Sequence, residues 1–108
     1  MNCADLLKLY DEMLCLTQKM LASARHSDWD RLIELEHERS VIVERLKQED
    51  IESLWTLSEG VKKGELIRSM LDIDAEIKLL TESQMMELRG MLDSVRIEQK
   101  LNNTYETP

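Results

Sequence analysis

Glu34 and His37 are the residues of this sequence whose types and spacing come closest to a known chemistry. The Glu-x-x-His spacing places a carboxylate and an imidazole on one helix face, and di-iron bundles use two such motifs with two further glutamates to hold their metals. This chain has one copy, and its other histidine, His26, has no carboxylate arranged to complete a second. A solvated helix face is therefore the favoured interpretation, and the sequence predicts no metal and no other cofactor.

The other reactive side chains also lack the spacing of a catalytic site. The two cysteines and two histidines match no catalytic family, and the sequence has neither a glycine-rich phosphate loop nor a Gly-x-Ser-x-Gly elbow. Most carboxylates have a Lys or Arg nearby, as Glu82 has Arg89, which is typical of solubilising charge rather than of acid–base pairs. The sequence therefore predicts a protein that binds and is not an enzyme.

Helix-forming residues dominate the chain, which has one proline, three glycines and no phenylalanine in 108 residues. Its net charge of −8 repels phosphate backbones, so we expect protein partners rather than direct nucleic-acid binding. We find no apolar run long enough for membrane insertion and no signal peptide, which predicts a cytoplasmic protein.

Cys3 and Cys15 lie roughly 18 Å apart on one predicted helix, too far for a disulfide, and are expected to be free thiols.

Hydrophobic periodicity predicts an all-α fold, an antiparallel bundle of three to four long helices. The first helix is expected over about 4–25, and the second begins after Ser27, whose hydroxyl is expected to cap it. The pattern is less regular in a connector at 48–64, and the third helix follows over about 65–95 or beyond. Residues 96–108 are expected to form a short fourth helix or a mobile tail. The inner side of the second helix is expected to carry Trp29, Leu32, Ile33, Leu35, Ile42, Val43 and Leu46.

The third predicted helix carries apolar residues around most of its circumference. Its main stripe, with steps of three and four residues, consists of Leu66, Met70, Ile73, Ile77, Leu80, Leu88, Met91 and Val95, and Gln84 fills one position. Leu79, Met86 and Ile97 lie roughly opposite this stripe, and Ile67, Leu71, Met85 and Leu92 lie between. Either other helices of the bundle bury these additional residues, or they form a surface for another polypeptide.

Two short motifs and the helical pattern resemble the flagellar export chaperone FliT family. The first motif is Asp28-Trp29-Asp30 at the start of the second predicted helix. The second, Leu101-Asn102-Asn103-Thr104-Tyr105, is the more specific, because the helical pattern alone fits many unrelated bundles. Between these motifs lies the long third helix, and the resemblance covers nearly the whole chain.

The resemblance implies a small antiparallel helical bundle that binds the filament-cap protein FliD in the cytoplasm before export. It also implies contacts with the export gate FlhA and the export ATPase. Enterobacterial members bind FlhC, which keeps the FlhDC transcription activator from DNA and represses flagellar genes. In flagellar chaperones a tyrosine near the C-terminal end contacts the gate protein, and the matching position here is Tyr105.

We expect the client to dock as an amphipathic helix on the third helix of a client-binding bundle formed by 1–95, with 96–108 as a separate C-terminal segment. The expected contact residues are Ile67, Leu71, Leu79, Met85, Met86 and Leu92. Two other interpretations remain open. One is a coiled-coil structural or scaffold protein that forms a homodimer and binds no client, and the other is a chaperone of another type III secretion system.

Overall fold

The structure is a computed structural model that describes residues 1–50 and 55–106, with only the backbone described at 103–106. Over these residues it contains three helices and no strand: α1 (Cys3–Arg25), α2 (Trp29–Glu49) and α3 (Leu57–Glu106). The predicted all-α class and helical bundle are therefore confirmed, with three helices in the described part of the chain.

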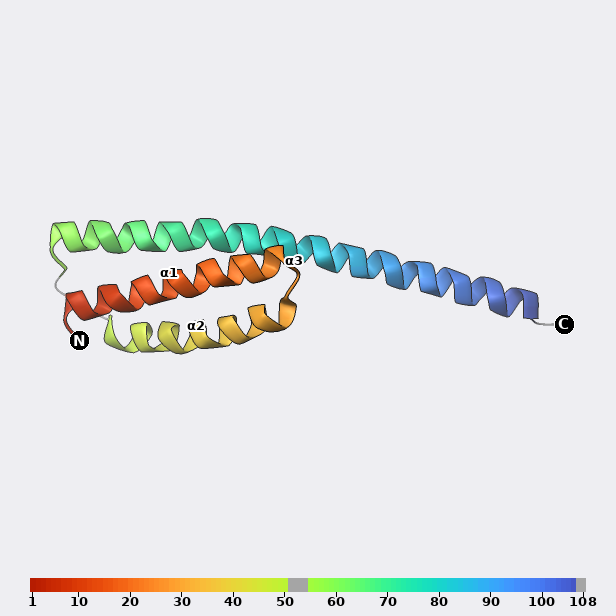
Figure 1. Cartoon of the computed structure of the whole chain (residues 1–108), viewed down its shortest axis with the longest axis horizontal. Helices are drawn as coiled ribbons and strands as arrows, with labels where there is room; N and C mark the ends of the chain where they lie inside the picture. The colour runs from red at the N-terminus through yellow and green to blue at the C-terminus, as the bar shows by residue number, and fades with distance from the viewer. Residues whose placement is uncertain (51–54, 107–108) are drawn as a thin grey trace. The chain divides into compact units, whose positions relative to one another are not determined.

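The chain divides into two compact units, which we call the bundle unit, Met1–Lys78, and the C-terminal unit, Leu79–Pro108. In the bundle unit α1 and α2 are antiparallel, and the first part of α3 runs in the direction of α1 (Figure 1). The described part of the C-terminal unit is the remainder of α3. The predicted division at residues 95 and 96 stays a prediction.

The core of the bundle unit draws on all three helices. One buried cluster contains Leu6, Leu9, Tyr10, Leu46 and Met70. Around it pack the partly buried residues Met13, Leu14, Ile42, Trp55, Leu66 and Ile67. Further buried apolar residues are Met20, Leu21, Ala24, Leu32, Leu35 and Ile77. The stripe predicted for the third helix is therefore buried or partly buried as far as Leu80, but Leu88, Met91 and Val95 are exposed.

The turn between α1 and α2 corrects the predicted cap. Asp28, not Ser27, is the N-cap of α2, and its Oδ1 accepts a hydrogen bond from the Arg31 amide at 3.2 Å. Ser27 instead has a φ of 56°, a left-handed conformation that ends α1, while its amide donates to the Ala24 carbonyl at 3.1 Å. A residue that closes one helix in this conformation does not have the extended backbone of an N-cap.

The second helix differs from expectation at one inner position. Leu32, Leu35 and Leu46 are buried as predicted, whereas Ile33 is 63% exposed. Leu32 and Leu35 are three residues apart and share the inner face, so Ile33, one residue after Leu32, is turned about 100° away from it.

The third helix begins earlier than predicted and continues past Val95 to Glu106. It begins at Leu57 because Thr56 and Glu59 form a capping box: Thr56 Oγ1 accepts from the Glu59 amide at 3.2 Å, and Glu59 Oε1 accepts from the Thr56 amide at 3.4 Å. Gly60 and Gly64 do not interrupt it. It continues to Glu106 because no proline occurs between Leu57 and Glu106, and the weak helix formers near its end lower helix propensity without blocking a backbone hydrogen bond. Of the predicted connector, Ile51 and Leu54 lie outside the described residues.

Candidate functional site

The bundle unit has a groove between α2 and α3 whose floor is formed by α1. Two concavities share Met13, Val43 and Ile67 and so form one surface, which we call the α2–α3 groove. Its full lining is Tyr10, Met13, Arg39, Val43, Leu46, Lys47, Asp50, Lys63, Ile67, Met70, Leu71 and Asp74. The middle of the groove is therefore apolar, and charged residues lie toward its two ends.

At one end, the carboxylate of Asp50 joins all three helices. Asp50 caps the C-terminus of α2, and its side chain, 7% exposed, accepts from the Tyr10 hydroxyl at 2.6 Å, Trp55 Nε1 at 3.1 Å and Lys63 Nζ at 2.5 Å. The Lys63 ammonium also lies 4.7 Å from the Trp55 ring centroid and 5.3 Å from that of Tyr10. We call these four residues the Asp50 cluster.

The pKa values of Asp50 and Tyr10 are shifted in opposite directions. Burial on its own raises the pKa of Asp50, but the hydrogen bonds from Lys63, Tyr10 and Trp55 stabilise the anion more strongly, so the pKa lies below its usual value. Burial, followed by the hydrogen bond to Asp50, raises the pKa of Tyr10 well above its usual value. At neutral pH Asp50 is therefore a carboxylate and Tyr10 a neutral phenol, and neither group exchanges a proton near neutrality.

At the other end, Arg39 connects α2 to both neighbouring helices. Its Nη1 donates to Asp74 Oδ1 on α3 at 2.7 Å and to Thr17 Oγ1 on α1 at 3.1 Å. Thr17 is fully buried, and its hydroxyl donates to the Met13 carbonyl at 2.8 Å. The Arg39 side chain is 20% exposed and that of Asp74 38%, so the cation of this pair is largely shielded from solvent and the carboxylate is partly open to it. The two ends of the groove are thus held by polar contacts between helices.

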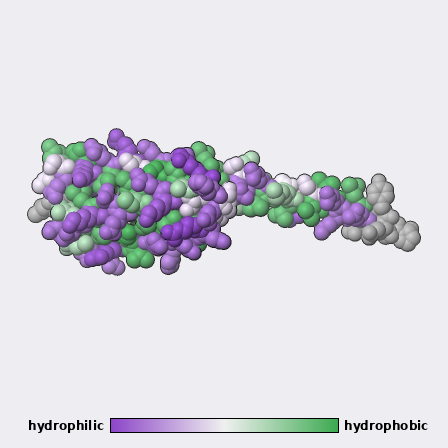
Figure 2. All heavy atoms as spheres, in the orientation of Figure 1, coloured by the Kyte–Doolittle hydropathy of each residue, from purple (hydrophilic) through white to green (hydrophobic). Residues whose placement is uncertain are grey.

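Two of the expected client contacts lie in the α2–α3 groove and four lie in the C-terminal unit. Ile67 packs partly against the core and Leu71 is 63% exposed, and both line the groove. In the C-terminal unit, Leu79 is 67%, Met85 49%, Met86 70% and Leu92 55% exposed. Figure 2 shows apolar green surface beside hydrophilic purple surface on this part of α3. Tyr105 lies in the last turns of α3, where only the backbone is described.

The sequence pattern did not single out the α1 and α2 residues of the groove. The pattern places Val43 on the inner face of α2 but does not indicate a groove, and in the structure both Val43 and Met13 are only partly buried. The available signal was Arg39, a charged residue within the inner face of α2, because a long cation in that position needs an anion from a neighbouring helix. Asp74 is that anion.

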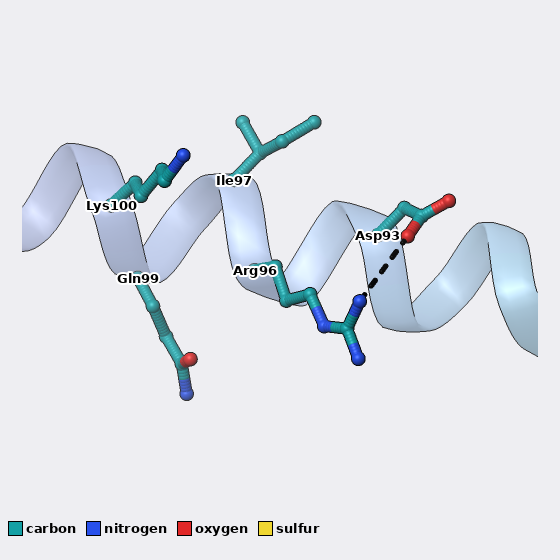
Figure 3. A pocket seen from close by; sticks show the side chains of 5 residues that line it. All are labelled: Asp93, Arg96, Ile97, Gln99 and Lys100. Carbon is teal, nitrogen blue, oxygen red and sulfur yellow. Dashed lines mark ion pairs between the residues drawn. The ribbon is translucent and has the colours of Figure 1, made fainter.

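A further concavity lies along α3 in the C-terminal unit (Figure 3). It is lined by Asp93, Arg96, Ile97, Gln99 and Lys100, and Figure 3 shows that all five side chains come from two turns of one helix. Asp93 and Arg96 form a weak ion pair at 4.0 Å, with both side chains largely exposed. Because one helix alone forms this surface, it is a shallow depression without enclosing walls.

The candidate metal residues Glu34 and His37 lie on the surface, and the two cysteines differ in exposure. Glu34 pairs with Arg31 at 3.0 Å, and the neighbouring His37 is exposed. Among residues 1–50 and 55–106, we find no group of three or more histidine, cysteine or acidic side chains placed to hold a metal ion. Cys15 is exposed and Cys3 partly buried, and neither forms a disulfide. Nor does any helix in the described ranges have the length and apolar character needed to cross a membrane.

Comparisons with known proteins give one consistent result. The family model described as flagellar protein FliT matches residues 7–107. The flagellar protein FliT of Photorhabdus laumondii is 32% identical over 104 residues, which is 96% of this chain and 83% of the relative. That of Yersinia enterocolitica is 32% identical over 100 residues, covering 93% and 83%. The crystal structure of flagellar protein FliT from Bordetella bronchiseptica superposes with a TM-score of 0.75 at 28% identity, covering 80% of this chain and 97% of that one.

Proposed function

Because the chain belongs to the flagellar protein FliT family, we propose that it is a flagellar type III export chaperone that binds the filament-cap protein FliD in the cytoplasm. The observation that carries this proposal is the amount of apolar surface left uncovered on α3. Among residues 79–102, nine large apolar side chains are exposed: Leu79, Met85, Met86, Leu88, Met91, Leu92, Val95, Ile97 and Leu101. Such a surface is typical of a protein that binds another polypeptide.

The apolar middle of the α2–α3 groove favours an amphipathic helix as the client segment. The middle of the α2–α3 groove offers Val43, Ile67 and Leu71, which would contact an apolar stripe of a docked helix. The polar contacts of Arg39 and of the Asp50 cluster at the two ends limit the length of the apolar contact. A client segment covered in this way cannot use the same apolar residues to assemble prematurely.

The groove is tested with a matched pair of single substitutions. Leu71→Ser changes a groove residue and Ile33→Ser a residue of α2 outside the groove, and both side chains are 63% exposed. We expect Leu71→Ser to weaken binding of a peptide from the C-terminal segment of FliD about fivefold or more in titration calorimetry, because it removes buried apolar area. Ile33→Ser should leave the affinity unchanged. Equal affinities for the two variants would exclude the groove as the client site.

The C-terminal unit is tested by a double substitution. Leu79→Ser with Met86→Ser should weaken client binding and leave the melting temperature nearly unchanged, because both side chains are at least two-thirds exposed. Val61→Ser with Leu57→Ser, also at exposed positions of α3, is the control for changed surface polarity. A melting temperature lowered by many degrees would instead identify Leu79 and Met86 as core residues.

Two further partners follow from the family and are proposed with it. Binding of FlhC would give the protein a second role as a negative regulator of the FlhDC activator, and pull-down with purified FlhDC tests this role. Contact with the export gate FlhA, beside the export ATPase, is assigned to Tyr105. A Tyr105→Ala variant should bind FliD normally and reduce its export, whereas normal export would favour a chaperone of another type III secretion system.

A homodimeric coiled-coil scaffold is the alternative that one observation favours. Leu88, Met91 and Val95 continue the main stripe of α3 and are exposed, as the seam of a second helix would require. Light scattering across a dilution series separates the two functions. A dimer that persists at low concentration and ignores the FliD peptide would support the scaffold, and a monomer that binds the peptide would support the chaperone.

A further inference from the structure

Five of the seven methionines of the chain fall into two groups by exposure. Met20 and Met70 are buried in the bundle unit and are 3% and 4% exposed. Met85, Met86 and Met91 are 49%, 70% and 63% exposed, and they lie within two turns of α3 in the C-terminal unit. An oxidant dissolved in water therefore reaches the second group of thioethers and is kept from the first.

The three exposed methionines point in three directions around the helix. At about 100° per residue, Met85 and Met86 lie roughly 120° and 140° to either side of Met91. A partner that packs on any side of these two turns therefore contacts at least one of the three thioethers. Unbranched methionine side chains adapt to different partner surfaces, which suits a binding surface of this kind.

We propose that Met85, Met86 and Met91 are sites of reversible oxidation to methionine sulfoxide, and that this modification releases a bound partner helix from the C-terminal unit. In the reaction with a peroxide, the thioether sulfur attacks one oxygen of hydrogen peroxide and the O–O bond breaks. That oxygen stays on sulfur, and the other leaves as water. Sulfur is oxidised by two electrons and the peroxide is reduced by two.

Oxidation weakens binding because it changes the polarity of the contact. A sulfoxide oxygen that is buried against an apolar partner loses its hydrogen bonds to water and gains none in return. One such group per interface corresponds to an affinity lower by about tenfold. Methionine sulfoxide reductases return the sulfur to the thioether, so the modification is reversible. This second half of the inference rests on the proposed function.

The sites are tested by peptide mass spectrometry of the full chain. The protein is treated with hydrogen peroxide for increasing times and then with dithiothreitol, which reduces oxidised cysteines and leaves sulfoxides intact. We expect sulfoxide to form at Met85, Met86 and Met91 at least about fivefold faster than at Met20 and Met70, and this difference to disappear in denaturant. Equal rates in the folded chain would overturn the assignment.

The effect on binding is tested with a variant that cannot form sulfoxide at these positions, Met85→Leu/Met86→Leu/Met91→Leu. Leucine keeps the apolar character, the approximate volume and the helix propensity of methionine. Met85 and Met86 are themselves expected contact residues, so the affinity of each protein for the FliD peptide before peroxide serves as that protein's own reference. After peroxide, wild-type affinity should fall about tenfold and be restored by the reductases, while the variant should keep its affinity.

Each contrary result has a distinct meaning. Unchanged wild-type affinity after complete oxidation of the three methionines would overturn the release mechanism and leave the chaperone proposal standing. An equal loss of affinity in the triple variant would place the sensitive group elsewhere and also overturn the release mechanism. If the untreated chain bound no FliD peptide, the proposed function and the release mechanism would fail together, and the oxidation rates alone would decide the modification sites.

Discussion

Asp50, the C-cap of α2, connects this helix to α1 and α3 through its side chain. Its carboxylate is 7% exposed and accepts hydrogen bonds from Tyr10 on α1, from Lys63 on α3 and from Trp55. Trp55 immediately precedes Thr56, the capping residue of α3. A buried carboxylate is stable only where its charge is paired and its lone pairs are satisfied, and here three donors do both. Asp50 therefore stabilises the end of α2 and the start of α3 together.

Asp50→Asn should lower the free energy of unfolding by about 2 kcal/mol at neutral pH, because the neutral amide no longer pairs with the Lys63 ammonium. The pKa of Asp50 is lower in the folded protein than the usual value of about 4. Its stabilisation is therefore complete above about pH 4 and is lost as the pH falls through the lower folded value. Urea denaturation at several pH values measures this difference.

The control is Glu49→Gln at the neighbouring position, where the carboxylate is 41% exposed and pairs with the chain's N-terminus at 3.4 Å. That substitution should change the free energy of unfolding by less than about 1 kcal/mol. A difference between wild type and Asp50→Asn that stayed constant down to about pH 2 would contradict the role given to the Asp50 charge.

At the scale of the elements, the start of α3 depends on the capping box formed by Thr56 and Glu59. Thr56→Ala removes the hydroxyl that accepts from the Glu59 amide, and we expect it to lower the free energy of unfolding by about 1 kcal/mol. Ser58→Ala, between the two, serves as the comparison because its hydroxyl accepts no backbone hydrogen bond in the capping box. Thermal unfolding of both variants measures the effect, and equal stabilities would show that the capping box contributes nothing.

Gly64 is a site at which α3 can be stabilised. A Cβ built at this position meets no heavy atom within 4 Å, and the backbone is helical. Gly64→Ala should therefore raise the free energy of unfolding by about 0.5–1 kcal/mol through the lower entropy of the unfolded chain. The increase should appear as a higher melting temperature. A lower melting temperature would mean that the position is more crowded than the structure indicates.

The helices illustrate which boundaries a single sequence predicts. The positions of α1 and α2 follow from their regular stripes and short connection, and both were predicted closely. The start of α3 was missed because two glycines outweighed the motif Thr56-Leu57-Ser58-Glu59, although a capping box is itself a sequence signal. The role of Ser27 could not be predicted, since Ser and Asp at adjacent positions are both good caps and backbone conformation decides between them.

At the scale of the whole molecule, the two units differ in what protects their backbone amides from exchange with solvent. In the bundle unit α3 packs against α1 and α2 through buried residues such as Met70 and Ile77. From Met85 to Asn102 every residue is exposed. We expect amide hydrogens of residues 85–102 to exchange with solvent much faster than those of residues 66–77, because opening there disrupts only hydrogen bonds within the helix.

Hydrogen exchange followed by mass spectrometry measures this difference in the full chain. Addition of the FliD peptide should slow exchange in residues 85–102 if the client covers the C-terminal unit, and near Leu71 if it occupies the α2–α3 groove. Equal protection of both halves of α3 in the absence of any partner would contradict the distinction between the two units.

The candidate surface was only partly predictable because it combines local and long-range information. The pattern of α3 indicates its additional apolar residues, since a helix that is apolar all round needs either complete burial or a partner. The groove does not follow from the pattern, because Met13, Val43 and Ile67 come from three helices and their separation depends on packing. Arg39 and Asp74 lie 35 residues apart in the chain and meet only in the folded protein.

The indole of Trp55 gives the chain an intrinsic optical probe. Its ring lies 4.7 Å from the Lys63 ammonium and its Nε1 donates to Asp50, so two opposite charges bear directly on its excited state. The sequence has one other tryptophan, and with Trp29→Phe the fluorescence would come from the junction of the three helices alone. The colour and intensity of that emission would report on this junction as a client arrives, without any attached dye.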